Sequence, residues 1–419
     1  MSNAMLNKEW AAIDIGTTKI CALIAKLDAK GDIEIIGIGH NPSHGLKKGV
    51  VVDINSTVKS IQKAIAVAEE MAGSKIEQAS IGISGGHIQS FNSQGVVVVH
   101  SKEVSQEDID KVIDIAKAIP IPEDREILHI LPQYFKVDGQ EQIKDSLGMQ
   151  GIRLESQIHI ITGSISSVSN IIKCCEDAGV GVSDIVLETL ASAESVLTEA
   201  ERELGVGVID IGGGTSDFAI YKDGRILHSK VLPIAGNHFT RDLAIGLQIS
   251  LKEAEELKRK YGFVSSKNPF SAECTPVGDD LGWGSDGRAI DPYSLYEILH
   301  PRAREVFELI VDDIVEFNLR PFMPYGLVLT GGGSLLGGMR ELASEEFGMP
   351  VRVGKPQNNL NSQGEEFVPD LLKSPVYSTG YGLLIYSSKG KDLTLAQSSS
   401  GPLVSRVVNR MKSWLYDFF

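Results

Sequence analysis

The sequence predicts an α/β fold made of two related lobes around a cleft. Three observations support this fold class: a strand–turn–strand pattern occurs twice, a helix follows each copy, and a third glycine-rich turn comes after a buried-looking strand. The turn of the first copy is Asp14–Lys19, and that of the second is Asp210–Asp217. A repeated supersecondary pattern indicates a duplicated unit, and the cleft between two such units is a common place for a ligand.

The first copy opens with three short segments that are rich in β-branched residues and bounded by turn-forming residues, as strands are. A helix is expected over Asp53–Met71, where apolar residues recur at helical spacing, with Ser56 or Thr57 as its N-cap. The predicted strands of this copy are Glu9–Ile15, Lys19–Leu27 and Ile33–Gly39.

The second copy repeats the same order of elements. Its strands are again bounded by glycine, aspartate and proline, and a helix again follows them. The predicted strands are Gly205–Ile211, Ser216–Tyr221 and Arg225–Pro233, and the predicted helix is about Asn237–Gly246.

The stretch from Ser84 to Ile165 fits neither copy and indicates an inserted subdomain, with a strand at Gly95–His100, a capped helix at Ser105–Ala118 and a strand near Ile127–Val137. Ser/Gly/Lys-rich residues near the C-terminus are typical of a flexible linker. We therefore expect a first lobe at 5–83, completed by 166–195 and 354–387; an inserted subdomain at 84–165; a second lobe at 196–353 with an upper subdomain at about 235–302; a long loop at 265–291; a linker at 388–402; and a helix at 403–419.

The composition excludes several function classes. A formal net charge of −15 argues against nucleic acid as a partner, because phosphate contacts need clustered lysine and arginine. The four cysteines show no CxxC spacing, so neither a disulfide framework nor a zinc site is indicated. No stretch approaches the roughly 18 consecutive apolar residues that a membrane-spanning helix needs.

The two repeated turns carry the chemistry of a phosphate site. A glycine-rich turn between strands exposes backbone N–H groups, and glycine lets a phosphate come close to them. Thr17, Thr18, Thr215 and Ser216 add hydroxyl donors. Two such hairpins that face each other could hold a triphosphate, although each alone is equally compatible with an ordinary hairpin turn. Neither the P-loop pattern nor the GxGxxG dinucleotide fingerprint is present.

A third glycine cluster follows the apolar stretch Tyr325–Thr330. A strand that enters a glycine turn and then a helix could let a flat ring or a phosphate lie on the backbone. A tight strand-to-helix turn with no ligand is the alternative interpretation. The stretch Pro375–Gly382 is rich in small residues and could form the opposite wall as a hinge.

These motifs together resemble the actin-like ATPase superfamily, whose duplicated fold is ribonuclease H-like, and within it the FtsA family of bacterial cell-division proteins. The resemblance covers essentially the full length and rests on WAAIDIGTTKICALIA, GISGGHIQS, VIDIGGGTSDFAIY, VLTGGGSLLGG, the insertion and the tail. It implies that ATP and Mg²⁺ are the cofactors and that hydrolysis is weak at most. The implied nucleotide-binding residues are Gly16, Thr17, Thr18, Lys19, Gly212, Gly213, Gly214, Thr215, Ser216, Glu255, Lys258, Arg259, Gly331, Gly332, Gly333 and Ser334, with Asp14 and Asp210 beside the metal.

Two of these assignments carry alternatives. The resemblance places Glu188 where relatives have an acidic or amide residue that orients the attacking water, but Thr189 follows it where relatives often have proline. It also places Glu255, Lys258 and Arg259 beside the adenosine, whereas the same residues could form a solvated charged face of a helix.

The last seventeen residues, 403–419, divide cleanly into an apolar and a polar half when they are placed on a helix. Such a helix could pack in a core, dock on a partner or lie on a membrane. The preceding linker, the basic character on an acidic chain and the aromatic residues favour an anionic membrane surface. The residues expected to touch the membrane are Arg406, Arg410, Met411, Lys412, Trp414, Leu415, Phe418 and Phe419.

The resemblance further implies a cell-division protein that polymerises like actin and tethers FtsZ filaments to the cytoplasmic face of the inner membrane at the division site. Its expected partners are the C-terminal peptide of FtsZ, further copies of this chain, the membrane surface and other division proteins. Arg302 and Arg304 are candidate contacts for an acidic peptide, or else solvated charges at a helix start. A pilus-assembly scaffold and a small-molecule kinase on the same fold remain alternatives.

Overall fold

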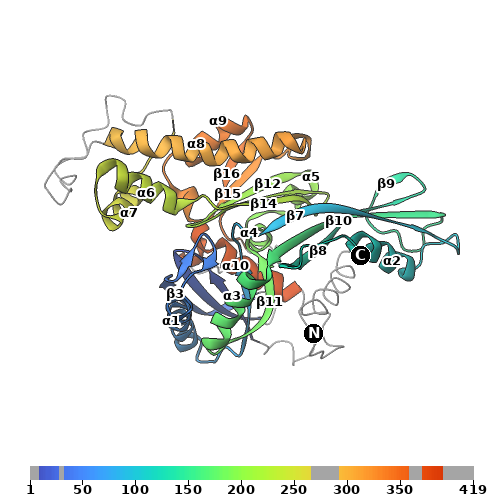
Figure 1. The fold of residues 1–419 in the computed structure, drawn as a ribbon, viewed down its shortest axis with the longest axis horizontal. Helices are drawn as coiled ribbons and strands as arrows, with labels where there is room; N and C mark the ends of the chain where they lie inside the picture. The colour runs from blue at the N-terminus through green and yellow to red at the C-terminus, as the bar shows by residue number, and fades with distance from the viewer. Residues whose placement is uncertain (1–8, 28–32, 266–291, 358–369, 390–419) are drawn as a thin grey trace.

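The computed structural model describes residues 9–27, 33–265, 292–357 and 370–389 (Figure 1). The predicted tail at 403–419, most of the predicted linker and nearly all of the predicted loop at 265–291 lie outside the described residues. The helix that precedes the tail extends to Lys389, so Ser388 and Lys389, which were expected to begin the linker, are helical.

Two five-stranded sheets of the same topology form the centre of the molecule. Their strand orders are β3-β2-β1-β6-β11 and β14-β13-β12-β15-β16. In both sheets the first two pairings are antiparallel and the last two are parallel. The strands of the first sheet are β1 Trp10–Ile15, β2 Lys19–Leu27, β3 Ile33–Pro42, β6 Gln78–Ile83 and β11 Gly181–Leu187; those of the second are β12 Val206–Ile211, β13 Ser216–Lys222, β14 Arg225–Leu232, β15 Leu327–Thr330 and β16 Val351–Val353.

The match between the two sheets extends to their register. Ile15 pairs with Ile20 at the end of the β1–β2 hairpin, and Ile211 pairs with Ser216 at the end of the β12–β13 hairpin, so both turns have the same length. The next pairing, β2 with β3 and β13 with β14, contains a register shift in each lobe. The predicted duplication of an α/β unit is therefore present.

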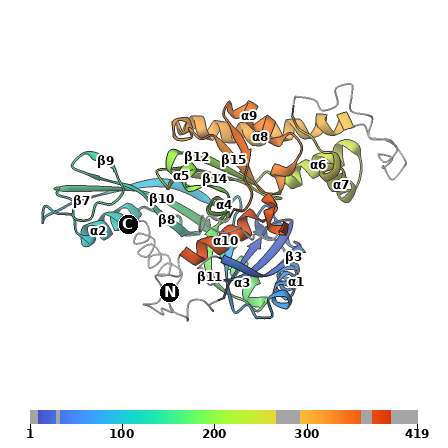
Figure 2. The same cartoon turned by 180° about the vertical axis from the view of Figure 1, so that it is seen from behind.

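Helices cover the first sheet on both faces and separate it from the second sheet (Figures 1 and 2). The helix α1 packs on β2 and β3 and touches α3, whereas α4 and α10 pack against each other. Because α4 contacts strands of both sheets, one apolar core continues from the first lobe into the second. These helices are α1 Ile54–Ala72, α3 Ile165–Asp177, α4 Glu188–Val196, α5 Glu199–Leu204 and α10 Ser378–Lys389, with the short hairpin β4 Leu46–Lys47 and β5 Val50–Val51 and the 3₁₀ turns η4 Asp370–Lys373 and η5 Pro375–Tyr377 nearby in sequence.

The N-terminus of α1 corrects a prediction. The N-cap is Asp53, whose carboxylate accepts a hydrogen bond from the backbone N–H of Ser56. Ser56 and Thr57, which the sequence offered as caps, lie in the first turn instead. An aspartate in extended conformation directly before the helix reaches the free N–H groups that a serine inside the first turn cannot cap.

Residues 89–164 contain a separate four-stranded antiparallel sheet in the order β7-β10-β8-β9, with α2 packed on β7 and β10. Its outer part has an apolar core of its own. It extends away from the two lobes along β7 and β10 (Figure 1). We call residues 84–165 the insert, and its elements are β7 Gln89–Val98, α2 Gln106–Lys117, β8 Arg125–Val137, β9 Gln140–Ile143 and β10 Arg153–Ser164.

The second sheet is covered by α8 and α9, and α6 and α7 lie at one end of α8 above the first lobe (Figure 1). A distinct apolar core joins these helices to the sheet. The elements are α6 Gly236–Leu247, α7 Leu251–Tyr261, α8 Pro292–Glu316 and α9 Met339–Phe347, with η2 Arg320–Phe322 and η3 Gly332–Leu335 as 3₁₀ turns.

Candidate functional site

A cavity of about 620 Å³ lies between the lobes and is lined by all three glycine turns. Its size falls within the usual range of about 300–1,000 Å³ for small-molecule and cofactor sites. Residues from the β1–β2 hairpin, the β12–β13 hairpin, the turn after β15, α4 and α7 converge on it. The predicted residues that line the cavity are Asp14, Gly16, Thr17, Thr18, Lys19, Glu188, Asp210, Gly212, Gly213, Gly214, Thr215, Glu255, Lys258, Arg259, Gly331, Gly332 and Gly333.

Two predicted residues are turned away from the cavity. The hydroxyl of Ser216 donates to the carbonyl of Ile234 at 2.7 Å, and that of Ser334 donates to the carbonyl of Gly331 at 2.7 Å. Both side chains are buried. Their hydroxyls brace the turns and are not free to donate to a ligand.

The two hairpins touch across the cleft. A Cβ added at Gly213 would collide with the side chain of Thr18, and one added at Gly214 would collide with Thr17. Thr17 is itself held in place, because its hydroxyl accepts a hydrogen bond from the backbone N–H of Gly49 at 3.1 Å. The glycines therefore let the two hairpins approach each other, which brings both sets of backbone N–H groups to one cavity.

Asp14 and Lys19 form an ion pair at the foot of the first hairpin, with 3.4 Å between Oδ2 and Nζ. The ammonium of Lys19 also donates to the carbonyl of Val376 at 2.6 Å and lies 4.3 Å from the ring centroid of Tyr377. Burial raises the pKa of Asp14, and the charge of Lys19 only partly offsets this effect. Lys19 is thus the cation that balances this carboxylate within the cleft.

Asp210 occupies the equivalent position at the end of β12. Its carboxylate accepts hydrogen bonds from Ser192 on α4 and, at 3.1 Å, from Thr379 on α10. Burial raises its pKa, and these hydroxyls act in the opposite direction. Gly331 has a φ of 80°, and a Cβ there would collide with Oδ1 of Asp210. The third glycine turn is therefore held against the carboxylate of Asp210.

Sequence reasoning missed Asp217 and Ser84. Asp217 pairs with Asp210 across the β12–β13 hairpin, and its Oδ1 accepts a hydrogen bond from the hydroxyl of Ser84 at 2.8 Å. The same hydroxyl lies 3.1 Å from Oγ1 of Thr215. Ser84 stands where the first lobe ends and the insert begins. Its hydroxyl therefore connects this junction to the second hairpin. Both residues stand in motifs that were singled out, but no spacing predicts a contact between residues so far apart in sequence.

Glu188 begins α4 and faces the same acidic group. Its pKa is raised well above the usual value by burial and by the neighbouring carboxylates of Asp14, Asp217 and Asp210. A cation placed among these carboxylates would favour their charged forms. Within the described residues, no three His, Cys, Asp or Glu side chains are arranged to bind a metal ion directly. The geometry fits a hard cation that is held through its water ligands.

The predicted charged residues of α7 form a bonded group at the other end of the cavity. Lys258 Nζ lies 2.6 Å from Glu255 Oε2 and also donates to the carbonyl of Gly236 at 3.0 Å, while Arg259 Nε lies 2.7 Å from Glu255 Oε1. The side chain of Lys258 is 13% exposed and that of Arg259 is 73% exposed. The interpretation of these residues as a solvated helix face is therefore wrong for Lys258, whose side chain is directed inward. It holds for Arg259.

Comparison with known proteins identifies the family. A family model for the SHS2 domain inserted in FTSA matches residues 85–162, and one for cell division protein FtsA matches residues 207–382. The cell division protein FtsA of Pseudomonas aeruginosa is 42% identical over 100% of both chains, and that of Escherichia coli K12 is 36% identical over 99% of this chain and 97% of its own. The chain belongs to the FtsA family of cell division proteins. The resemblance found in the sequence is confirmed.

Solved structures show the same fold. A structure titled PilM-PilN type IV pilus biogenesis complex matches with a TM-score of 0.65 at 16% identity, and covers 90% of this chain and 98% of that chain. MreB5 of Spiroplasma citri bound to ADP matches with a TM-score of 0.52 at 15% identity, over 91% of this chain and 97% of that chain. The predicted duplicated actin-like fold with an FtsA-type insert is therefore confirmed.

Two predictions for this FtsA-family chain concern surfaces outside the cleft. Arg302 on α8 forms ion pairs with Asp242, at 2.5 Å between Nε and Oδ2, and with Glu305. Arg304 is more exposed and lies 3.0 Å from Glu308 and 3.1 Å from Glu346. The predicted membrane-binding residues lie outside the described residues. Within those, no helix combines the length and the apolar character needed to cross a bilayer.

Proposed function

We propose that this chain is an ATP-binding, actin-like cell-division protein that polymerises and attaches FtsZ filaments to the inner face of the cytoplasmic membrane. The proposed binding of ATP rests on one observation: both hairpins and the third glycine turn line the same cavity. Membership of the FtsA family favours this function over a pilus-assembly scaffold or a small-molecule kinase.

The residues of the cleft suggest a division of tasks. The N–H groups at Gly16–Lys19 and Gly213–Thr215 would bind the phosphates, with Lys19 as a further charge, whereas the N–H of Gly212 donates to the carbonyl of Thr215 at 2.9 Å. Asp14 and Asp210 would hold the waters of Mg²⁺, which supplies positive charge beside the phosphates. The glycine turn after β15 and the Glu255–Arg259 segment would enclose the adenosine. The fold neighbour MreB5 was solved with ADP and with AMPPNP, which is in line with this proposal.

Hydrolysis would be slow, with Glu188 as the group that orients the attacking water. Burial and the neighbouring carboxylates raise the pKa of Glu188, and a cation beside it would lower that pKa and favour the carboxylate form that accepts a hydrogen bond from water. We therefore assign the nucleotide to the control of filament assembly rather than to rapid turnover.

Thermal unfolding with and without Mg²⁺-ATP tests the nucleotide site. At a hundredfold excess of ATP over its Kd, a bound ligand stabilises the folded state by about 2.7 kcal/mol. Asp210→Asn keeps an oxygen that can accept from Ser192 and Thr379 but loses the charge. We expect it to fold as stably as wild type and to lose the Mg²⁺-dependent part of the stabilisation, whereas Asp177→Asn on the surface of α3 should behave as wild type.

Failure of ATP to raise the melting temperature of the wild-type chain would contradict the nucleotide site. An Asp210→Asn variant that keeps the full difference between Mg²⁺ and EDTA would contradict the role of Asp210 beside the metal, while leaving ATP binding itself intact.

For the attachment to FtsZ, Arg304 is the better placed of the two predicted contacts. Its side chain is 53% exposed against 28% for Arg302, and Arg302 is already bound to two carboxylates on its own lobe. An acidic peptide could take the place of Glu308, which is 52% exposed, at little cost, because exposed ion pairs contribute only about 0–1 kcal/mol.

A further inference from the structure

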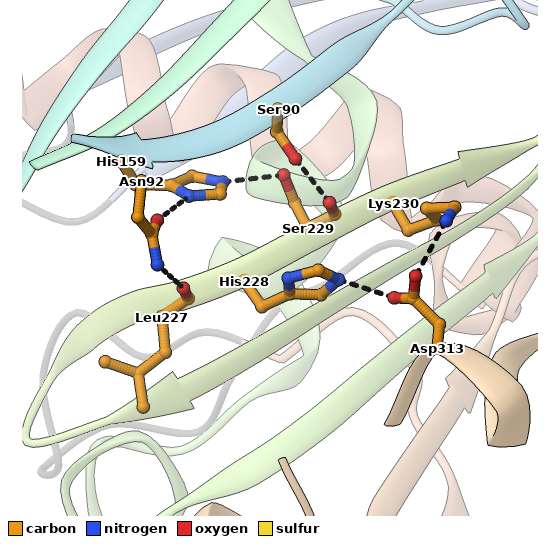
Figure 3. A network of polar contacts seen from close by, with 8 residues as sticks. All are labelled: Ser90, Asn92, His159, Leu227, His228, Ser229, Lys230 and Asp313. Carbon is orange, nitrogen blue, oxygen red and sulfur yellow. Dashed lines mark hydrogen bonds and ion pairs between the residues drawn. The ribbon is translucent and has the colours of Figure 1, made fainter. Parts of the chain in front are cut away.

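The insert is continuous in sequence with the first lobe, yet a group of its polar side chains binds the edge strand β14 of the second lobe (Figure 3). The strand β14 pairs with β13 on one side only, so its other edge presents carbonyl groups that need partners. Ser90 of β7 donates to the carbonyl of Ser229 at 2.5 Å. The insert thus satisfies a sheet edge with side chains rather than with another strand.

Two β-bulges meet at this contact. The pairing of β8 with β10 skips Gln133, and the pairing of β14 with β13 skips Leu227. The side-chain amide of Gln133 donates to the carbonyl of Leu227 at 2.8 Å and to that of Ile226 at 3.1 Å. A bulge turns a side chain or a carbonyl group out of the regular ladder. The bulge in β8 therefore supplies the donating amide, and the bulge in β14 supplies the accepting carbonyl.

The contact is reciprocal, because β14 also donates to the insert. Arg225 donates from Nη1 to the backbone carbonyl of Gln133 at 2.6 Å and from Nη2 to the carbonyl of Lys144 at 2.9 Å. Arg225 is 7% exposed and Gln133 is 3% exposed. Removal of either partner would leave buried polar groups without hydrogen bonds, which costs roughly 1–3 kcal/mol per group.

His159 adds a second chain of hydrogen bonds (Figure 3). Its Nδ1 lies 2.6 Å from Oδ1 of Asn92, and its Nε2 lies 2.9 Å from the hydroxyl of Ser229. Asn92 in turn donates to the carbonyl of Leu227 at 3.3 Å. A neutral ring with its proton on Nδ1 satisfies every bond: Ser229 donates to Nε2, and Nδ1 donates to Asn92.

A Ser–His–Asn series of this kind resembles a nucleophilic triad, but access decides against that role. Ser229 is 2% exposed and His159 is 1% exposed, and neither lines the cavity between the lobes. A substrate cannot reach the hydroxyl, so the series holds two parts of the protein together.

The other face of β14 is bound to the helix α8, which fixes this strand within the second lobe. Asp313 of α8 binds both His228, at 2.5 Å, and Lys230, at 2.7 Å, on that face. The strand is therefore held by β13 and by α8, whereas the outer part of the insert packs around a core of its own. If the contact opens, the outer part of the insert moves and β14 stays, because Leu128, Leu131 and Ile161 of the insert's inner part belong to the core of the lobes.

We propose that Asn92, Gln133, His159, Arg225 and Ser229 form a polar latch that sets the docked position of the insert on β14, and that the outer part of the insert separates from β14 as a body when the latch is broken. Contacts of this kind exchange readily with water, because an intramolecular hydrogen bond has a net value of only about 1 kcal/mol. The latch thus holds the insert in one orientation through the sum of several such bonds, each of which water can replace once the contact opens.

Hydrogen–deuterium exchange of the full chain tests the latch. Gln133→Glu preserves the shape of the side chain but replaces the donating amide with a carboxylate that faces two carbonyls. Gln157→Glu is the matched control on the neighbouring strand β10, since Gln157 accepts from the hydroxyl of Tyr134 and a carboxylate accepts equally well. We expect Gln133→Glu to raise exchange about tenfold in peptides that cover 89–94, 131–135 and 225–231, with α2 and β12 unchanged, and Gln157→Glu to match wild type.

Two results would overturn the proposal. Unchanged exchange in Gln133→Glu would mean that the latch does not hold the insert. Faster exchange throughout, with α2 and β12 included, would mean that the residue supports general stability rather than docking. Asn92→Ala, which removes an exposed side chain and introduces no charge, must give the same local pattern even if Gln133→Glu folds poorly.

Discussion

At the scale of single residues, His159 is the group whose charge the fold suppresses most clearly. Burial lowers its pKa to about 3, and His228 and His129 act in the same direction. In the unfolded chain a histidine has a pKa near 6.5. Between these two values the unfolded state binds a proton that the folded state does not bind, so the free energy of unfolding falls as the pH falls.

We therefore expect His159→Gln to remove a pH-dependent component from stability. From pH 7 to pH 5 the wild-type chain should lose roughly 2 kcal/mol from this residue alone, and the difference between wild type and variant should shrink by that amount. Urea unfolding at the two pH values measures it. His44→Gln, at an exposed histidine of the first lobe, is the control and should follow wild type. Stability curves that stay parallel for His159→Gln would contradict the suppressed charge.

The contacts of single side chains were the features that the sequence predicted least well. Asp14 and Asp210 could be singled out because each precedes a glycine turn. Asp217 and Ser84 could not, because their bond joins β13 to the start of the insert over a long sequence separation. Ser216 and Ser334 were expected to face the cavity, but the hydroxyl of each donates to a nearby backbone carbonyl instead.

At the scale of elements, the contact between the two hairpins determines how closely the lobes approach. Gly213→Ala would place a methyl group against the side chain of Thr18, so the hairpins would have to separate. We expect a loss of about 1–2 kcal/mol from the free energy of unfolding, as for other overpacked sites. Adding Thr18→Ala removes the two nearest atoms of the threonine and should restore most of the loss.

Denaturant unfolding of the four chains of this double-mutant cycle gives the coupling energy directly. Gly181→Ala is the control, because a Cβ there meets its nearest neighbour at an ordinary 3.4 Å. Additive effects of Gly213→Ala and Thr18→Ala, with no rescue, would show that the hairpins do not press on each other in solution.

Elements with a strong local pattern could be predicted from the sequence. The hairpins of both lobes were found because glycine and threonine separate two runs of β-branched residues, and α1 because its apolar residues keep helical spacing. The cap of α1 was misassigned because Asp53, Ser56 and Thr57 are all favourable types, and only the backbone geometry distinguishes among them. The strand β7 begins at Gln89, six residues before the predicted Gly95, because its first residues are polar and bind other strands.

At the scale of the whole molecule, the duplication could be predicted but the docking of the insert could not. The two lobes repeat the same turn and the same order of strands. A single sequence is enough to detect this repeat. The contact of the insert with β14 depends on two bulges and on side chains such as Gln133 and His159, which no periodicity reveals. Architecture follows from repeated local patterns, whereas the placement of one subdomain on another follows from a few specific polar contacts.

The last prediction concerns the whole chain, because it links the cleft to the predicted membrane helix at 403–419. One short amphipathic helix binds a bilayer weakly, but many helices on one filament bind together and multiply their effect. If ATP promotes assembly, membrane attachment should depend on ATP. Co-sedimentation with anionic vesicles, with and without Mg²⁺-ATP and with FtsZ added, measures both steps.

We expect the full chain to sediment with anionic vesicles and to carry FtsZ with it, more strongly with ATP. Truncation to residues 1–402 and Trp414→Glu should each abolish this, because they remove the apolar face. Tyr416→Glu adds the same charge on the predicted polar half and should retain most of the binding, which separates the apolar face from net charge. Full binding by both the truncated chain and Trp414→Glu would contradict the tail as the attachment point, while binding that ignores ATP would leave the tail in place and contradict its link to assembly.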